Sequence, residues 1–306
     1  MNIKAGRKKI EISHPDKILF SGVRLTKADL AVYSQDIAQW MLPHIKDRAL
    51  TLERCPDGIE DGCFMQQEAM IHFPDYVGRA TLKRKNGSDL THVVCNNAAT
   101  LVYLANMGVV TIHTWLSRIG TPYCPDRMVF DLDPPGKDFT SVIKAAGLLK
   151  EILEETGLVS FPMTTGSKGL HIVVPLDRQA DFDTTRGFAR DISSILTARY
   201  PDFLTTEQRL NNRRGRLFLD VQRNAYGQTG VAPFTVRTQP ECPVATPLEW
   251  KELFDSHTDI HAQSFTITNI LERLDQMGDP WQGMARRARS LRGPRRKLNQ
   301  LMKNQN

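Results

Sequence analysis

Apolar residues recur along the chain in two spacings, one typical of helices and one typical of strands. In residues 27–47 they fall at helical intervals, with Leu30, Ile37 and Met41 on the predicted buried side, and Pro43 is expected to kink or end this helix. Further helices are predicted over residues 97–107, 139–156, 184–199 and 266–277. Strands are predicted near residues 49–53, 63–66, 91–95, 127–133 and 216–222. This alternation predicts a fold of the α/β (α+β) class.

Composition is ordinary for a globular protein, with 41% hydrophobic and 24% charged residues among 306. No apolar stretch approaches the ~20 residues that a membrane helix needs, and the N-terminus lacks the apolar segment of a signal peptide. The five cysteines lack paired C-x-x-C spacing, which favours reduced thiols, although Cys55 and Cys63 would be able to pair under oxidation. We therefore expect a cytoplasmic protein with no membrane partner.

Charge is distributed unevenly. From Pro280 onward there are eight basic residues and no acidic one, whereas the first 279 residues carry a net charge of −2. Residues 281–306 therefore read as a basic C-terminal tail. Such a block contacts nucleic-acid phosphates or is simply a solvated segment.

Two aspartates, Asp131 and Asp133, end the apolar strand Met128-Val-Phe-Asp-Leu-Asp133, and two prolines follow at once. Side chains at i and i+2 of a strand project from the same face, so the two carboxylates point into one space. Paired hard oxygen ligands suit Mg²⁺ or Mn²⁺, and two such ions roughly 3.5–4 Å apart serve in-line phosphoryl transfer. The alternative is an exposed turn with two solvated acids.

Two later segments carry matching chemistry. The loop Thr164-Thr-Gly-Ser-Lys-Gly-Leu-His171 combines glycines that allow close backbone approach with hydroxyls and a lysine suited to phosphate. The strand Arg216-Leu-Phe-Leu-Asp-Val-Gln222 contains an acid, Asp220, that is costly to bury unless it is paired or metal-bound. Asp220 is thus a candidate third carboxylate for the Asp131/Asp133 site.

Together with Cys95-Asn-Asn-Ala98, Ile112-His-Thr-Trp115 and Val231-Ala-Pro-Phe-Thr-Val-Arg237, these segments resemble the archaeo-eukaryotic primase superfamily. More closely they resemble the polymerase domain of prokaryotic non-homologous end-joining, a module of ligase D. The resemblance runs from Ile12-Ser-His-Pro-Asp-Lys-Ile-Leu19 to Pro247-Leu-Glu-Trp250. It implies a primase-polymerase catalytic core, about 91–280, with a mixed or antiparallel sheet flanked by helices. A smaller N-terminal portion, about 1–90, would pack on this core within a single domain, 1–280.

The resemblance also implies roles for individual residues. Asp131, Asp133 and Asp220 would be catalytic and would bind two divalent cations, Mn²⁺ or Mg²⁺. The nucleotide would be held by His113, Thr165, Ser167, Lys168, His171, Arg223 and Arg237. DNA with a 5′-phosphate would be bound by Lys17, Lys27 and Phe64. Two positions depart from the family pattern: Thr165 replaces a frequent serine, and Gln228 replaces a frequent lysine.

Several of these residues have structural alternatives. Lys17 and Lys27 are also read as solvated charges, and Thr26-Lys-Ala-Asp29 reads as a capping box that begins a helix. Phe64 and His113 are equally candidates for packing positions.

The function implied is template-directed polymerisation by a nucleotidyltransferase that fills short gaps at double-strand breaks, with a preference for ribonucleotides. Two alternatives are a de novo primase, which needs no primer, and a non-catalytic module that bridges DNA ends. Because no K-x-D-G ligase motif occurs, Ku and an ATP-dependent ligase are expected as separate chains, unless this chain is a segment cut from a fused protein.

Overall fold

The computed structural model describes residues 1–136 and 138–303, and the chain divides into two compact units. Unit 1 comprises residues 1–120, 229–246 and 265–279, and unit 2 comprises residues 121–228, 247–264 and 280–306. The first unit extends beyond the N-terminal portion expected over about residues 1–90, because it continues to Gly120 and takes in two later segments. None of the described helices combines the length and the apolar composition that crossing a bilayer requires.

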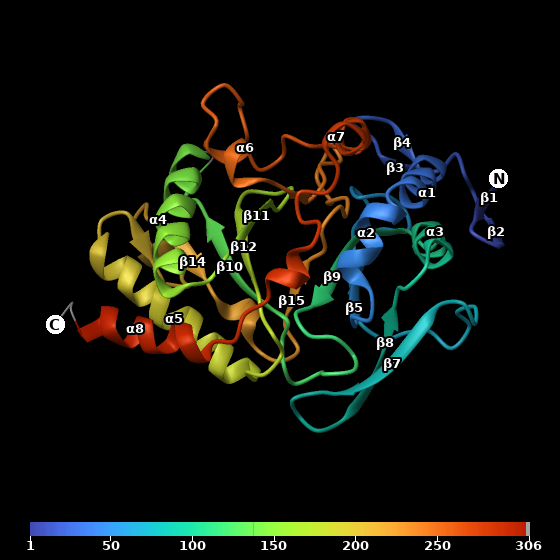
Figure 1. The fold of residues 1–306 in the computed structure, drawn as a ribbon. Helices are drawn as coiled ribbons and strands as arrows, with labels where there is room; N and C mark the ends of the chain where they lie inside the picture. The colour runs from blue at the N-terminus through green and yellow to red at the C-terminus, as the bar shows by residue number, and fades with distance from the viewer. Residues whose placement is uncertain (137, 304–306) are drawn as a thin grey trace. The chain divides into compact units, whose positions relative to one another are not determined.

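Unit 1 is built on a six-stranded sheet (Figure 1). Its order is β15-β9-β5-β8-β7, with β6 paired to β5. These strands are β5 (Leu50–Arg54), β6 (Phe64–Gln66), β7 (Gly78–Lys83), β8 (Asp89–Val94), β9 (Val109–Trp115) and β15 (Thr229–Val231). Two small hairpins precede it: β1 (Asn2–Ala5) with β2 (Lys8–Glu11), and β3 (Ile18–Phe20) with β4 (Leu25–Thr26). The helices are α1 (Lys27–Asp36), α2 (Ala38–Ile45), α3 (Ala98–Asn106) and α7 (Ile270–Met277).

Local sequence explains where these helices begin and end. Thr26 and Asp29 form the predicted capping box at the start of α1. The single helix predicted over residues 27–47 is instead two helices that meet at Ile37, and Pro43 lies inside α2. Helix α7 begins at Ile270 rather than at Thr266, because the Thr266 N–H donates to Asn269 Oδ1 at 2.8 Å in a turn.

One expectation about the cysteines is wrong in this unit. Cys55 and Cys63 form a disulfide, whereas Cys95, Cys124 and Cys242 have free thiols. The pairing follows from the β5–β6 register, in which Arg54 lies opposite Phe64, so that the residues just beyond them meet. Their Cα atoms lie 4.4 Å apart.

Unit 2 contains a second six-stranded sheet of order β13-β14-β10-β12-β11-β16. The sheet is mixed, because β13 and β14 run parallel whereas β10 runs antiparallel to both β12 and β14. The strands are β10 (Arg127–Asp133), β11 (Phe161–Thr164), β12 (Leu170–Pro175), β13 (Leu204–Thr205), β14 (Leu217–Asp220) and β16 (Thr246–Pro247). Helices α4 (Thr140–Thr156) and α5 (Phe182–Arg199) pack against it, and α6 (Trp250–Phe254) contacts β11. Gly157, at φ +90°, ends α4 as predicted.

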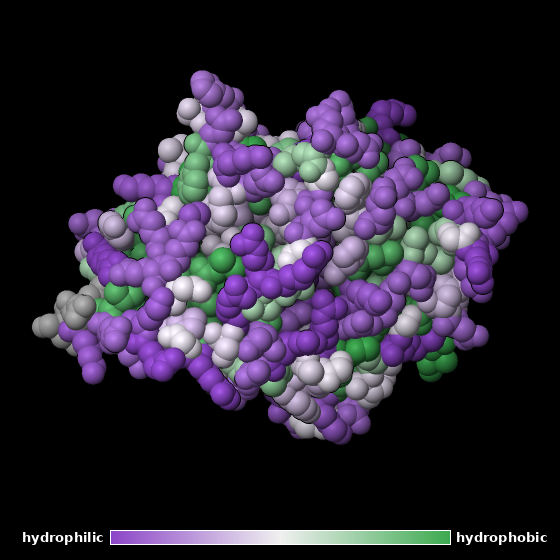
Figure 2. All heavy atoms as spheres, in the orientation of Figure 1, coloured by the Kyte–Doolittle hydropathy of each residue, from purple (hydrophilic) through white to green (hydrophobic). Residues whose placement is uncertain are grey.

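The basic C-terminal segment is not merely a tail. Residues 292–303 form α8 (Arg292–Lys303), which packs on α4 and α5 through the fully buried Leu298. Basic and polar residues make up most of the rest of the helix, and the surface at α8 is largely hydrophilic (Figure 2). The last three residues of the predicted tail lie outside the described part of the chain.

Candidate active site

The three aspartates meet on the central strands of the unit 2 sheet. Asp131 of β10 lies directly opposite Asp220 of β14 and, on its other side, opposite His171 of β12. Residues directly opposite in an antiparallel pair share a face, and Asp133 shares that face with Asp131 as its i+2 neighbour. Leu132 points the other way and is fully buried. The predicted grouping of the three acids on one face is therefore what the strand register produces.

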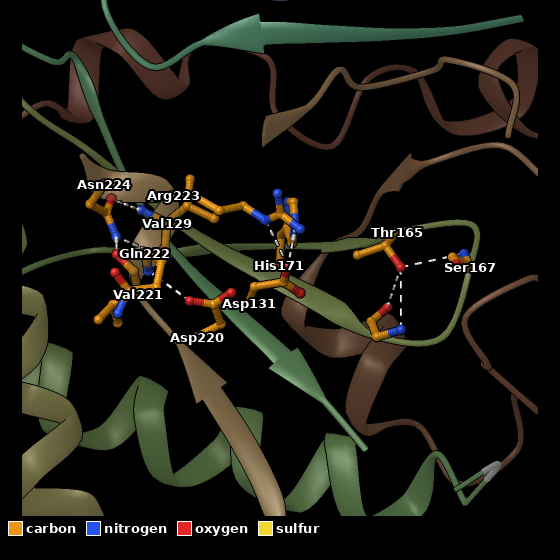
Figure 3. Close-up of polar contacts among 11 residues, drawn as sticks. Val129, Asp131, Thr165, Ser167, His171, Asp220, Val221, Gln222, Arg223 and Asn224 are labelled. Carbon is orange, nitrogen blue, oxygen red and sulfur yellow. Dashed lines mark hydrogen bonds and ion pairs between the residues drawn. The ribbon is translucent and has the colours of Figure 1, made fainter. Parts of the chain in front are cut away.

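Asp131 is the most enclosed of these acids, with 3% of its surface exposed. Arg223 Nε donates to Asp131 Oδ2 at 2.8 Å, and His171 Nε2 lies 3.3 Å from the same oxygen. Burial alone would raise the pKa of Asp131, but His171 and Arg223 together hold that pKa well below its usual range. Figure 3 shows both basic side chains directed at Asp131, with Asp220 beside it.

The pKa of Asp133 is shifted in the opposite direction to that of Asp131. Burial and, after it, the nearby charge of Asp131 raise the pKa of Asp133 to about 6, although Arg223 lowers it. Two carboxylates that crowd one face repel each other, so one retains its proton more readily than a free side chain does. This site therefore carries excess negative charge that a cation would relieve.

The segment of residues 222–224 that follows Asp220 fixes its position through hydrogen bonds. The Gln222 N–H donates to Asp220 Oδ1 at 2.7 Å, and Arg186 of α5 contacts Gln222 Oε1. Asn224 then joins the segment to β10: the Val129 N–H donates to Asn224 Oδ1 at 2.8 Å, and Asn224 Nδ2 donates to the Val129 carbonyl at 2.6 Å. Arg186, Gln222 and Asn224 were not predicted from the sequence, because nothing local to them marks their partners across the sheet.

The predicted phosphate loop connects β11 to β12. Thr165 closes it: its hydroxyl donates to the Gly169 carbonyl at 3.1 Å and accepts from the N–H groups of Ser167 and Gly169 at 3.3 and 3.2 Å. Gly166, at φ +66°, adopts the left-handed conformation that glycine tolerates best. Lys168 is exposed, and Gln263 Nε2 donates to the Ser167 carbonyl at 3.1 Å. Figure 3 shows Thr165 and Ser167 on this loop.

Gly169 sets the distance between this loop and the acidic strand. A Cβ atom at Gly169 would lie 2.3 Å from the Leu132 carbonyl oxygen and 3.4 Å from Asp133 Oδ1. The first distance is far below van der Waals contact, so only glycine allows the loop to lie this close to β10.

The remaining predicted residues belong to unit 1. His113 is a half-buried residue of β9, and Arg237 follows β15, with its backbone N–H donating to the Pro243 carbonyl at 2.8 Å. Lys17 and Lys27 are neighbours: the Lys27 N–H donates to the Lys17 carbonyl at 2.8 Å. Burial lowers the pKa of Lys27, and the charge of Lys17 lowers it further. Phe64 is 49% exposed, so it is not a core residue.

The three acids are the type of ligand that binds a divalent cation, but their side chains are not arranged around one common point. Within residues 1–136 and 138–303, no three His, Cys, Asp or Glu side chains converge closely enough to hold a metal ion. Asp131 faces Arg223 and His171, and Asp220 accepts a backbone N–H. Three carboxylates with a crowded, partly protonated member nevertheless match the hard oxygen donors that Mg²⁺ and Mn²⁺ prefer.

Comparison with known proteins identifies the class and then the family. Residues 26–281 match the family model described as LigD, primase-polymerase domain. The polymerase domain from Mycobacterium tuberculosis ligase D, solved in complex with DNA, superposes with a TM-score of 0.84 at 27% identity and covers 92% of this chain and 99% of that one. The fold is thus that of a primase-polymerase core. The chain belongs to the LigD primase-polymerase domain family, a group of generally metal-dependent nucleotidyltransferases.

Two curated relatives extend the comparison. The bifunctional non-homologous end joining protein LigD of Bacillus subtilis is 33% identical over 275 residues, which cover 89% of this chain and 44% of that protein. The multifunctional non-homologous end joining protein LigD of Pseudomonas aeruginosa is 31% identical over 300 residues, covering 97% and 34% respectively. The chain therefore spans less than half the length of these relatives.

Proposed function

We propose that this protein is a template-directed nucleotidyltransferase that fills short gaps at DNA double-strand breaks during non-homologous end-joining. Family membership supports this class of activity. The single observation that carries it is the register of β10 and β14, which sets Asp131 opposite Asp220 beside a glycine-containing loop. A DNA-bridging module would gain nothing from three acids that repel one another and the phosphates nearby.

The acids would hold two divalent cations, Mg²⁺ or Mn²⁺. When bound, these ions would activate the primer 3′-hydroxyl and offset charge on the nucleotide phosphates. Arg223 and His171 keep the Asp131 carboxylate ionised and fixed in direction, which is the state that a cation requires of a ligand. Asp133 would lose its proton on binding.

The loop of unit 2 supplies groups that would hold the nucleotide. In unit 2 the exposed Lys168 and the Ser167 hydroxyl extend from the loop closed by Thr165, and they suit a triphosphate. His113 and Arg237, which the family resemblance also implicates in nucleotide binding, belong to unit 1. We also infer a preference for ribonucleotides, which follows from the family resemblance.

The DNA end would be recognised by unit 1. Lys17 and Lys27 lie close enough for the charge of Lys17 to lower the pKa of Lys27, and two neighbouring lysines suit the dianionic 5′-phosphate on the far side of a gap. Phe64 exposes an aromatic ring that can stack on a template base. Ku and a DNA ligase are the proposed protein partners.

Primer extension on a gapped duplex tests this function. We expect Mn²⁺- or Mg²⁺-dependent, template-directed addition of ribonucleotides in preference to deoxynucleotides, stimulated by a downstream 5′-phosphate. Synthesis without a primer would indicate a primase instead. Firm DNA binding without any nucleotide addition would indicate a bridging module.

A further inference from the structure

The disulfide of unit 1 closes a loop against the hairpin that carries Lys17. Cys55 follows β5 directly and Cys63 directly precedes β6. The disulfide therefore closes the loop of residues 56–62 that connects these two strands. The loop lies along β3: the Ile59 N–H donates to the Leu19 carbonyl at 2.9 Å, and Ser21 Oγ donates to a Glu60 carboxylate oxygen at 2.5 Å. The covalent loop and the lysine-bearing hairpin therefore form one local assembly.

Two groups inside the closed loop hold the Lys17 ammonium. Lys17 Nζ donates to the Asp57 carboxylate at 2.6 Å and to the Pro56 carbonyl at 3.1 Å. Asp57 also opposes the repulsion between Lys17 and Lys27, because its charge raises the pKa of Lys27 against the effect of burial. The position of the Lys17 ammonium thus depends on residues 56 and 57, and the charge of Asp57 also acts on Lys27, whose Nζ donates to Ser13 Oγ at 3.2 Å.

The other end of the loop places Phe64. This residue follows Cys63 and begins β6, a strand of three residues that pairs with β5 alone in the sheet order. The Arg54 guanidinium lies 5.4 Å from the centre of the Phe64 ring. A strand this short has few hydrogen bonds to fix it, so a covalent link at the residue just before it contributes to its order.

We propose that the Cys55–Cys63 disulfide is a positioning element for 5′-phosphate recognition, because one covalently closed loop sets both the Lys17 ammonium and the Phe64 ring. This inference rests on the proposed function of Lys17, Lys27 and Phe64. Recognition of the DNA end then depends on the redox state of this pair. Nucleotide addition on a primer–template without a downstream 5′-phosphate, which the unit 2 acids would carry, does not.

Reduction by a dithiol would proceed at the exposed sulfur. Cys63 is exposed and Cys55 is fully buried, so a reagent thiolate attacks Cys63 Sγ and Cys55 leaves as a thiolate that takes up a proton. The second thiol of the reagent then displaces Cys63, and the reagent departs as a cyclic disulfide. Two protein thiols replace one disulfide, and the loop between them is free to open.

The test compares DNA affinity in oxidised and dithiothreitol-treated protein. Fluorescence anisotropy would give Kd for two gapped duplexes that differ only in a downstream 5′-phosphate or 5′-hydroxyl. We expect reduction to lower the preference for the 5′-phosphate by about three- to tenfold, the effect of losing one or two exposed charged or aromatic contacts. Affinity for the 5′-hydroxyl duplex should change little.

Two variants make the result specific. Cys63→Ser, at an exposed position, should show the reduced phenotype with or without dithiothreitol. Cys124→Ser, which removes a half-buried free thiol of unit 2, should keep the full response. Alkylation of the unfolded protein should label three cysteines before reduction and five after it.

The possible results distinguish a failure of the disulfide's role from a failure of the 5′-phosphate site itself. A 5′-phosphate preference that neither dithiothreitol nor Cys63→Ser alters would overturn the role of the disulfide alone. Five alkylated cysteines in untreated protein would do the same. No 5′-phosphate preference in the oxidised protein would overturn the phosphate site itself, and this inference with it.

Discussion

At Asp131 and Asp133, two identical side chains two residues apart acquire opposite acid–base behaviour from their surroundings. Arg223 and His171 stabilise the charge of Asp131, so its pKa lies below the usual range despite burial. Among the residues that the structure describes, no basic side chain forms an ion pair this close with Asp133, which faces the charges of Asp131 and Asp220 instead. A cation that binds here meets one carboxylate already ionised and another that must first release a proton.

The raised pKa of Asp133 predicts a pH dependence of stability. The native state binds more protons than the unfolded state between the ordinary aspartate pKa of 3.8 and the folded-state pKa of about 6. With a chelator present to remove metal ions, the free energy of unfolding should therefore fall as pH rises through this window, by on the order of 1–3 kcal/mol.

Asp133→Asn should remove this pH-dependent loss of stability and be more stable than the parent at pH 7. Urea unfolding from pH 4 to 7 measures it, with the exposed Asp202→Asn as control; equal pH profiles for both variants would refute the assignment.

The sequence alone was sufficient to predict that the three acids lie on one face of the sheet, but not to predict which side chains pair with them. The i, i+2 spacing of Asp131 and Asp133 defines a shared face in any strand, and an acid inside the apolar run at Asp220 indicates a paired role. The ion pair from Arg223 to Asp131 joins residues 92 apart in sequence. No local pattern encodes such a contact, because it depends on which strands become neighbours.

Among the elements, the loop between β11 and β12 depends most on a single residue. Gly169→Ala would place a Cβ atom 2.3 Å from the Leu132 carbonyl oxygen, so β10 or the loop must move. We expect a loss of about 1–3 kcal/mol of stability and a clear fall in nucleotide addition.

Gly187→Ala in α5 provides the matched control for that substitution. A Cβ there meets no atom within 4 Å, and alanine favours helix, so stability should rise by about 0.5–1 kcal/mol with unchanged activity. Urea midpoints and primer-extension rates measure both variants. An active Gly169→Ala protein as stable as the parent would show that the close approach is unimportant.

Strands with a clear buried face were predicted well. The structure places β10 at residues 127–133, as predicted, because an apolar run ended by two prolines leaves little freedom in where the strand ends.

Helix α8 was missed because its sequence is rich in basic residues. Its few apolar contacts, such as Leu298, become informative only when α4 and α5 provide a surface. Cys55 and Cys63 were predicted to be able to pair only under oxidation, because the β5–β6 register that brings them together is not visible in the sequence.

For the molecule as a whole, the residues proposed for catalysis and those proposed for DNA-end recognition lie in different units. The acids and the phosphate loop lie in unit 2, whereas Lys17, Lys27 and Phe64 lie in unit 1. Each unit's contribution is therefore open to separate measurement, by nucleotide addition for one and by 5′-phosphate preference for the other. The sequence did not reveal this division, because the chain enters each unit three times and no linker marks the crossings.

The most direct test of the central claim is gap filling by Asp220→Asn, which keeps the size of the side chain but removes a carboxylate. Primer extension should fall more than about 100-fold, because charge stabilisation worth several kcal/mol is lost. Binding to the same gapped duplex should persist, since the proposed DNA-end contacts belong to unit 1. Asp202→Asn, an exposed acid of the same unit, should retain full activity. If Asp220→Asn extends primers as fast as Asp202→Asn, the three aspartates are not the catalytic site and the account is wrong.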